Sequence, residues 1–332
     1  MLNFSRRAWL LPLVAFALQP AAAAWAEPGK AAHSTPAKSA PKAADAKDAA
    51  PKPVVQDYRP RPALWLLADA DTKIYLFGTI HMLPPGFRWR SEALDRTIEE
   101  ADELVVETYD DGDDYMGAMA ALLRKEPKPL LERVPEGRRA ALQEAVDASG
   151  FPLSTFDYMQ TWAAAMFLGI SALLESYGAD DPDDAPGVED VLEAVFLEAG
   201  KPIGSIEDPM TVVASLNALP EEAQVSLLIG KEADGGDGKS STEDELAAHD
   251  KDIHLWAQGK PETLADDLTG EMPPALYEAL VTRRNAAWID WLEARLERPG
   301  TLLLAVGAGH LAGPDSVQAM LKARGLEAKR ID

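Results

Sequence analysis

The sequence predicts an α/β fold, with a central, mostly parallel mixed sheet, surrounding helices and a helical middle region. Apolar runs end in Gly-x-x-His near both ends of the chain's main body, at residues 74–81 and 302–310. A third apolar run, residues 103–107, follows a stretch with helical periodicity. Continuous apolar runs are typical of strands buried on both faces of a parallel sheet. Apolar and amphipathic stretches of helical length across residues 115–230 predict the helical middle region.

Residues 1–26 have the features of a cleaved export signal peptide. Arg6 and Arg7 precede an apolar run from Ala8 to Leu18, and the segment ends in the A-x-A-like "AWA". The apolar run is shorter than the ~20 residues that span a bilayer. We therefore expect a periplasmic or secreted protein with no integral membrane segment after cleavage. The paired arginines also resemble a twin-arginine signal.

Residues 27–62 are rich in Ala, Lys and Pro and contain few bulky apolar side chains. Such a segment cannot bury enough apolar surface to offset its ordering entropy, so it is predicted to be a disordered or extended tether. Residues 63–332 then form the folded body.

The folded body is strongly acidic. The whole chain has a net charge of −23, and residues 1–26 and 27–62 carry +2 and +3, which leaves −28 on the body. This charge argues against a nucleic-acid partner, because such binding needs Lys and Arg to neutralise phosphates. It favours cationic partners or a divalent metal. The chain has no cysteine, which excludes disulfides, thiolate catalysis and cysteine-type zinc sites.

The elements of the body follow from local patterns. Two strand-like runs joined by residues 69–73 predict a β-hairpin. Ser91 can cap a helix that leads into the strand 103–107. The remaining predicted elements, in order, are helices over 135–150, 155–178 and 187–200, a strand over 203–207, a helix from about Pro209, a long helix over 274–297, and a closing strand, Gly-rich turn, helix and edge strand.

Both histidines of interest stand where a predicted strand ends. Gly78 and His81 follow one strand, and Gly307 and His310 follow the other with the same spacing. In open α/β sheets, ligands bind outside the carboxyl ends of the strands. Glycine lets the backbone turn sharply and approach a ligand closely, which is a candidate role for Gly78, Gly307 and Gly309. A single Gly-x-x-His is better explained by a buried structural histidine than by a functional site, so a functional interpretation depends on the pair together with a nearby carboxylate.

A third strand brings a carboxylate to the same edge, because the run "ELVVE" ends at Glu107. Two imidazoles and one carboxylate form a minimal ligand set for a divalent metal with open positions. Without metal, the same residues can perform general acid–base chemistry. His249 and His254 are five residues apart, which does not align them on one helix face, and we expect both at the surface.

The body resembles the TraB/PrgY/GumN family, which includes the Tiki membrane proteases. The resemblance runs from about Ala63 to the C-terminus and rests on ordered motifs: "LFGTIHMLP", "ELVVET", "GVEDVLEAVFLEAGKPIGSIED", "TRRNAAWIDWL" and "LLLAVGAGHLAGPDSVQAMLKARG". It implies a fold related to erythromycin-esterase-like proteins. For the Tiki branch it implies a peptidase that depends on manganese or cobalt, with zinc or iron as alternatives. This chain shows no membrane segment at its C-terminal end, so proteolysis is inferred by analogy.

The resemblance also implies roles for particular residues. His81, His310 and Glu107 would hold the metal or act as acid and base. The family's Arg-Asn pair falls on Arg284 and Asn285, where Arg284 would stabilise an oxyanion or grip a substrate carboxylate and Asn285 would orient a ligand or the substrate backbone. Without the family, both would be interpreted as helix-face contacts. The family's glutamate after the middle strand falls on Glu207, either as support for the site or as a strand-end ion pair.

The sequence therefore predicts an exported, metal-dependent hydrolase that acts on a peptide or protein substrate. Two alternatives remain open. One is a periplasmic protein that binds or sequesters a peptide without cutting it. The other is a hydrolase that uses the histidines and Glu107 without metal.

Overall fold

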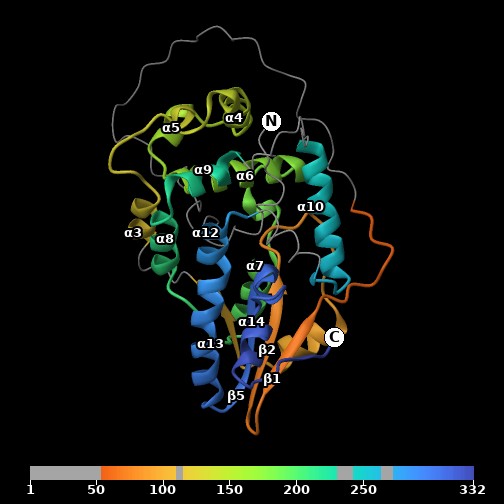
Figure 1. The fold of residues 1–332 in the computed structure, drawn as a ribbon. Coiled ribbons are helices and arrows are strands. Elements are labelled where there is room, and N and C mark those ends of the chain that lie inside the picture. Colours follow the sequence, from red (N-terminus) through yellow and green to blue (C-terminus); the bar gives the residue numbers. More distant parts are fainter. Residues whose placement is uncertain (1–53, 110–114, 230–241, 263–271) are drawn as a thin grey trace, which may run out of the picture.

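The computed structural model describes residues 54–109, 115–229, 242–262 and 272–332. The predicted signal peptide and most of the predicted tether lie outside this range. The centre of the fold is a six-stranded mixed sheet in the order β4-β3-β5-β2-β1-β6. Its strands β1, β2 and β5 are labelled in Figure 1. The predicted α/β class is confirmed. The strands are β1 Leu64–Ala68, β2 Thr72–Thr79, β3 Glu103–Val106, β4 Ile203–Ser205, β5 Gly300–Gly307 and β6 Lys329–Arg330.

Four neighbouring strands of the sheet run parallel. β5 pairs in parallel with β2 on one side and with β3 on the other, and β4 extends the sheet beyond β3. β1 pairs antiparallel with β2 and with β6. The β1–β2 hairpin turns at Asp69, whose carboxylate accepts the backbone N–H groups of Asp71 and Thr72. The parallel strands therefore end at one common edge.

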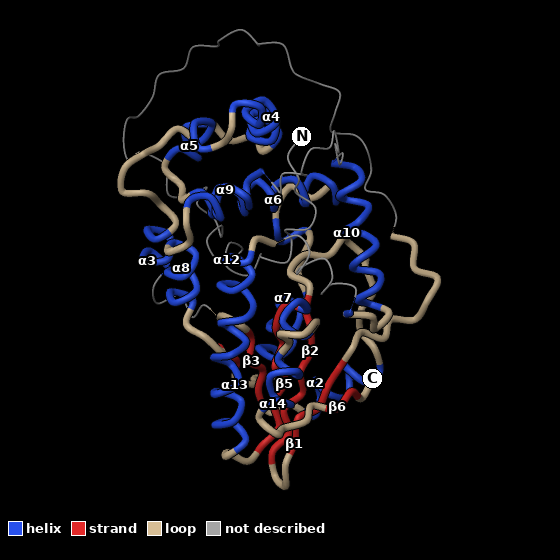
Figure 2. The backbone as a smooth tube through the Cα atoms, viewed as in Figure 1, coloured by secondary structure: helices blue, strands red, loops and turns tan. Residues whose placement is uncertain are grey.

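Helices cover both faces of the sheet and form a separate region beyond its carboxyl edge (Figure 2). One face packs against α2, α7 and α10, and the other packs against α13 and α14. The α-helices are α2 Glu92–Glu100, α3 Tyr115–Ala121, α4 Arg139–Ala148, α5 Leu153–Asp157, α6 Thr161–Tyr177, α7 Val188–Glu198, α8 Pro209–Asn217, α9 Glu221–Ile229, α10 Thr242–Ala257, α12 Pro274–Tyr277, α13 Arg283–Leu296 and α14 Val317–Ala323. Short 3-10 helices span Leu130–Arg133, Glu136–Arg138, Pro182–Asp184 and Ala308–Leu311.

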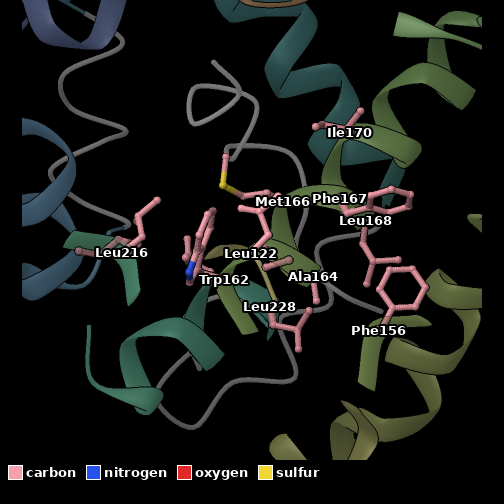
Figure 3. Close-up of a cluster of buried hydrophobic side chains, with 14 of the residues drawn as sticks. Leu122, Phe156, Trp162, Ala164, Met166, Phe167, Leu168, Ile170, Leu216 and Leu228 are labelled. Carbon is pink, nitrogen blue, oxygen red and sulfur yellow. The ribbon is translucent and has the colours of Figure 1, made fainter. Parts of the chain in front are cut away.

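The helical middle region has a hydrophobic core of its own. Trp162 is fully buried at its centre, and Phe156 and Phe167 meet edge to face with ring centroids 5.5 Å apart (Figure 3). The α6 helix is apolar on nearly all sides, because it is enclosed by other helices. This region packs as a layer distinct from the sheet.

The single helix predicted over residues 155–178 is wrong. The chain instead forms α5 and α6, separated at residues 158–160. Arg133 explains the break, because its buried guanidinium donates to the carbonyl oxygens of Phe156, Asp157 and Met159. These carbonyls are thereby satisfied by a side chain rather than by a continuing helix.

The long helix predicted over residues 274–297 contains a π-helical turn, Glu278–Thr282, between α12 and α13. A π-turn adds a residue to the helical path and is frequent at functional sites. Here it directly precedes Arg284 and Asn285 and sets the face on which they project.

Residues 54–62, which the sequence assigns to the tether, lie against the body. Gln56 exchanges hydrogen bonds with the backbone of Arg88, at 2.7 and 2.8 Å. The Tyr58 hydroxyl lies 2.7 Å from Nδ1 of His254, and the Arg61 N–H donates to Ala257 at 2.7 Å. None of the helices formed by the described residues is both long and apolar enough to cross a lipid bilayer.

The expected surface position of His249 is wrong, and His254 is half-buried rather than fully exposed. His249 is only 3 % exposed, and its Nε2 lies 2.8 Å from the Tyr177 hydroxyl. The His254 ring packs edge to face against Phe87 and is bonded to Tyr58. Burial lowers the pKa of His249 to about 4. The spacing of the two histidines does not reveal their burial, because α10 packs its Ile253, Trp256 and Ala257 into the core beside the sheet.

The buried His249 predicts a pH dependence of stability. The folded state keeps this imidazole neutral down to a pKa of about 4, whereas the unfolded chain takes up a proton near pH 6.5. Stability is therefore lost as pH falls through this window, by up to about 1.4 kcal/mol per pH unit from this residue. Urea denaturation of the parent and of His249→Gln between pH 7 and pH 4.5 checks this. The variant should show the shallower slope, and identical slopes would contradict the assignment.

Candidate active site

Three residues singled out from the sequence lie at the carboxyl edge of the sheet. Thr79, the last residue of β2, pairs with Gly307, the last residue of β5, and β3 lies on the other side of β5. His81, Glu107 and His310 follow the ends of these three strands. Their exposed fractions are 8 %, 4 % and 7 %, so the structure brings all three together in a buried position.

Glu107 is held as an anion. Its Oε1 accepts the Gly307 N–H at 2.6 Å and lies 3.6 Å from Nε2 of His310. Its Oε2 accepts a hydrogen bond from Arg284. Burial alone would raise the pKa of Glu107, but the positive charge of Arg284 and the neighbouring imidazoles outweigh it and lower the pKa to about 2.

Arg284 is the fixed cation of the site. Its Nε donates to both oxygens of Glu207, at 2.9 and 3.1 Å, and its Nη2 donates to Glu207 and to Glu107. Its Nη1 donates to the Leu280 carbonyl at 3.2 Å and lies 3.1 Å from Nε2 of His310. All five N–H groups of the guanidinium therefore face an acceptor. Arg284 is thus committed to its neighbours in this structure rather than free to grip a substrate.

Glu207 supports Arg284. The carboxylate also accepts the Nε1–H of Trp288 at 3.2 Å, and the Arg284 guanidinium lies over the Trp288 ring, 5.2 Å from its centroid. Burial raises the pKa of Glu207, although the charge of Arg284 opposes the rise. The sequence left two roles open for Glu207, support for the site or a strand-end ion pair. Its contacts with Arg284 and Trp288 fit support for the site.

Asn285 fixes the orientation of His310. Its amide nitrogen donates to the carbonyl oxygens of His310 and Asp315, at 3.2 and 2.7 Å. Its Oδ1 must then accept the proton on Nδ1 of His310, 2.6 Å away. Nε2 of His310 consequently carries a lone pair, which faces Arg284. Burial and the nearby guanidinium lower the pKa of His310 to about 3, so the ring is neutral at ordinary pH.

His81 is held by Glu189, a residue that sequence reasoning missed. The Glu189 Oε1 lies 2.5 Å from Nδ1 of His81 and also accepts the Thr79 hydroxyl. Burial would lower the pKa of His81, but the charge of Glu189 outweighs it and the pKa is raised. The only sequence feature that pointed to Glu189 is the acidic first turn of α7. Acidic residues are common there because they stabilise a helix N-terminus, so this feature did not mark Glu189 as part of the site.

Glycines shape the space between these groups. A Cβ added to Gly307 would lie 3.1 Å from both Glu107 Oε1 and His81 Nε2, so the absence of a side chain leaves a small cradle between these two atoms. A Cβ on Gly187 would lie 2.3 Å from the His81 carbonyl oxygen. Gly78 instead permits close packing, because its Cβ would lie 2.9 Å from the Ala308 backbone. Gly309 lies buried in the 3-10 helix that carries His310.

The donor types at this edge suit a metal, but their arrangement is incomplete. Nε2 of His81 and Oε1 of Glu107 face the cradle, whereas Arg284 contacts the third candidate donor, Nε2 of His310. Among the described residues, no three His, Cys, Asp or Glu side chains form a ready-made metal-binding group. In the state with both imidazoles neutral, which metal binding requires, the carboxylates of Glu107, Glu189 and Glu207 against one guanidinium leave two negative charges.

Comparisons with known proteins match nearly the whole body. The sequence model of the TraB/PrgY/gumN family matches residues 63–330. The uncharacterized protein YbaP of Escherichia coli (strain K12) is 25% identical over 266 residues, which cover 79% of this chain and 92% of the relative. YbaP of Shigella flexneri matches with the same identity and coverage. No solved structure matches the chain.

Because Gly187 lies in close contact with His81, even a substitution by alanine should lower the stability of the fold. Gly187→Ala should destabilise the fold by ~1–3 kcal/mol, because the new methyl group would overlap the His81 backbone. The backbone of Gly187, with φ −72°, is open to alanine, so the cost is one of space alone. Gly204→Ala is the matched control, since a Cβ there meets nothing within 4 Å. Equal unfolding free energies for both variants in urea denaturation would contradict this packing.

Proposed function

Because this chain belongs to the TraB/PrgY/gumN family, we propose that it is an exported hydrolase of peptides or related amides. His81, His310 and Glu107 form its reactive centre, and a divalent metal, manganese or cobalt, is its cofactor. The observation that carries the proposal is the convergence of these three side chains from the ends of three adjacent parallel strands. The proposal that the protein is exported is supported by the signal-peptide features of residues 1–26.

The chemistry of the site supports a metal in three ways. The cradle beside Gly307 is flanked by one imidazole nitrogen and one carboxylate oxygen, which are common metal ligands. Both histidines have Nδ1 held by an outer oxygen, from Glu189 or Asn285, as metal-binding histidines usually do. The two surplus negative charges also match a divalent cation, because buried charges need compensation. His81, His310 and Glu107 would hold the ion.

A bound divalent metal would supply Lewis-acid chemistry and lower the pKa of a water molecule. The chain's own residues prepare the site for it. When His81 is neutral, Glu189 keeps its one ring proton on Nδ1, so Nε2 faces the cradle with its lone pair. The fixed charge of Arg284 lies beside Glu107 and can balance negative charge that develops during hydrolysis. Burial of all three reactive side chains strengthens these electrostatic interactions.

A second candidate function is hydrolysis without metal. One observation favours it: His81, with a carboxylate on Nδ1 and Nε2 facing the cradle, has the arrangement of a histidine general base. In this version His81 takes a proton from water, and the positive charge of Arg284, without a direct hydrogen bond, stabilises the oxyanion. Exhaustive chelation separates the two candidates. Activity that disappears with chelator and returns with manganese supports the metal enzyme, whereas undiminished activity supports the general base.

Substitutions at the reactive centre should remove activity without unfolding the protein. His81→Ala and His310→Ala should each lower the hydrolysis of a peptide mixture, measured by mass spectrometry, by ~100-fold or more. Gly307→Ala should do the same, because its methyl group would fill the cradle while its φ of −48° suits alanine.

Gly204→Ala serves again as the control that keeps parent activity. Thermal unfolding of all four variants shows whether the fold is intact. Turnover at the parent rate in both histidine variants would refute the proposed centre. Ligand that binds saturably and is recovered uncut from the parent would point instead to a peptide-binding protein.

A further inference from the structure

Arg284 occupies the position at which the proposed metal site lacks its third ligand. We propose that Arg284 and a divalent cation compete for Nε2 of His310, so that the metal binds only when the guanidinium releases this atom. The inference rests on the proposed function, because it assumes a metal ion at His81 and Glu107. It goes beyond that function by assigning to Arg284 control over the occupancy of the site.

The competition follows from the single lone pair of His310. Asn285 Oδ1 lies 2.6 Å from Nδ1 and takes the ring proton, which leaves one lone pair on Nε2. Nη1 of Arg284 is 3.1 Å from that atom and points a proton at it. One lone pair cannot bond an N–H and a metal at the same time. Binding of the guanidinium and binding of the ion at His310 are therefore mutually exclusive.

Arg284 also substitutes electrostatically for the ion. Its guanidinium is buried, with 10% of the side chain exposed, and it pairs with both Glu107 and Glu207. A buried carboxylate pair without a cation would be strongly destabilising. Arg284 thus stabilises the two carboxylates by itself, through its ion pairs with Glu107 and Glu207.

Glu207 allows Arg284 to release His310 without leaving the site. Nε and Nη2 both donate to Glu207, and the guanidinium also lies over the Trp288 ring. Only Nη1 contacts His310, and its second acceptor is the carbonyl of Leu280 in the π-helical turn. A small rotation about the Glu207 contact would therefore free Nε2 while the charge pair with Glu207 persists.

The test is titration calorimetry of the protein, purified from cells expressing the full chain, with manganese chloride. Two variants separate the His310 contact from the charge. Arg284→Met removes both, whereas Arg284→Lys keeps the positive charge but loses the fork that reaches Glu207 and His310 together. We expect both variants to bind manganese at least about tenfold more tightly than the parent, because a charge-assisted hydrogen bond no longer competes.

Three outcomes would overturn the inference. If Arg284→Lys binds manganese as the parent does and only Arg284→Met binds more tightly, charge alone is responsible. If parent and both variants bind equally, Arg284 does not compete, although the proposed metal enzyme survives. If no folded variant binds manganese, the proposed metal site itself fails.

Two further variants keep the test decisive. Adding His310→Ala to Arg284→Lys should return manganese binding to the parent level or below, because the contested ligand is gone. Should Arg284→Met not fold with Glu107 and Glu207 unpaired, the double variant Arg284→Met, Glu207→Gln removes one of the two carboxylates with the cation. Near-ultraviolet circular dichroism identifies the folded variants.

Discussion

The register of the parallel pair β2–β5 is the constraint on which the site depends. Thr79 lies opposite Gly307, so the two Gly-x-x-His segments leave the sheet at the same level. β3 lies on the other side of β5, with Val106 opposite Ala305, which brings Glu107 to the same edge. A register shift by one residue would turn the alternating side chains to the opposite face. The apolar packing on both faces of the sheet holds this register.

The second organising feature is a surplus of buried negative charge. The pKa of His81 is raised although the ring is buried, which indicates a negative local potential. The pKa of Glu107 is nevertheless lowered to about 2, because Arg284 faces it directly. The site therefore contains one carboxylate, Glu107, that is strongly paired with a cation, and one imidazole, His81, whose surroundings favour its protonated form. This asymmetry makes the cradle beside Gly307 the natural position for a cation or a proton.

Local patterns in the sequence predict the strands, most helices and the residues that follow the strand ends. They do so because buried parallel strands are continuous apolar runs and because Gly-x-x-His after a strand is conspicuous in a chain with five histidines. The roles of Glu189 and Arg133 depend on contacts across the fold, with His81 and with the carbonyls at the end of α5. No local pattern distinguishes either from an ordinary charged residue. The π-helical turn before Arg284 is likewise invisible in a regular amphipathic stretch.

The most direct test of the account is anomalous diffraction at the manganese absorption edge from crystals grown with manganese. We expect one anomalous peak in the cradle beside Gly307, within bonding distance of His81 Nε2, His310 Nε2 and Glu107, with Arg284 turned away from His310 and still paired with Glu207. A site without anomalous density in crystals that hold manganese elsewhere, with Arg284 still on His310, would contradict the claim that the two Gly-x-x-His segments meet around one ion.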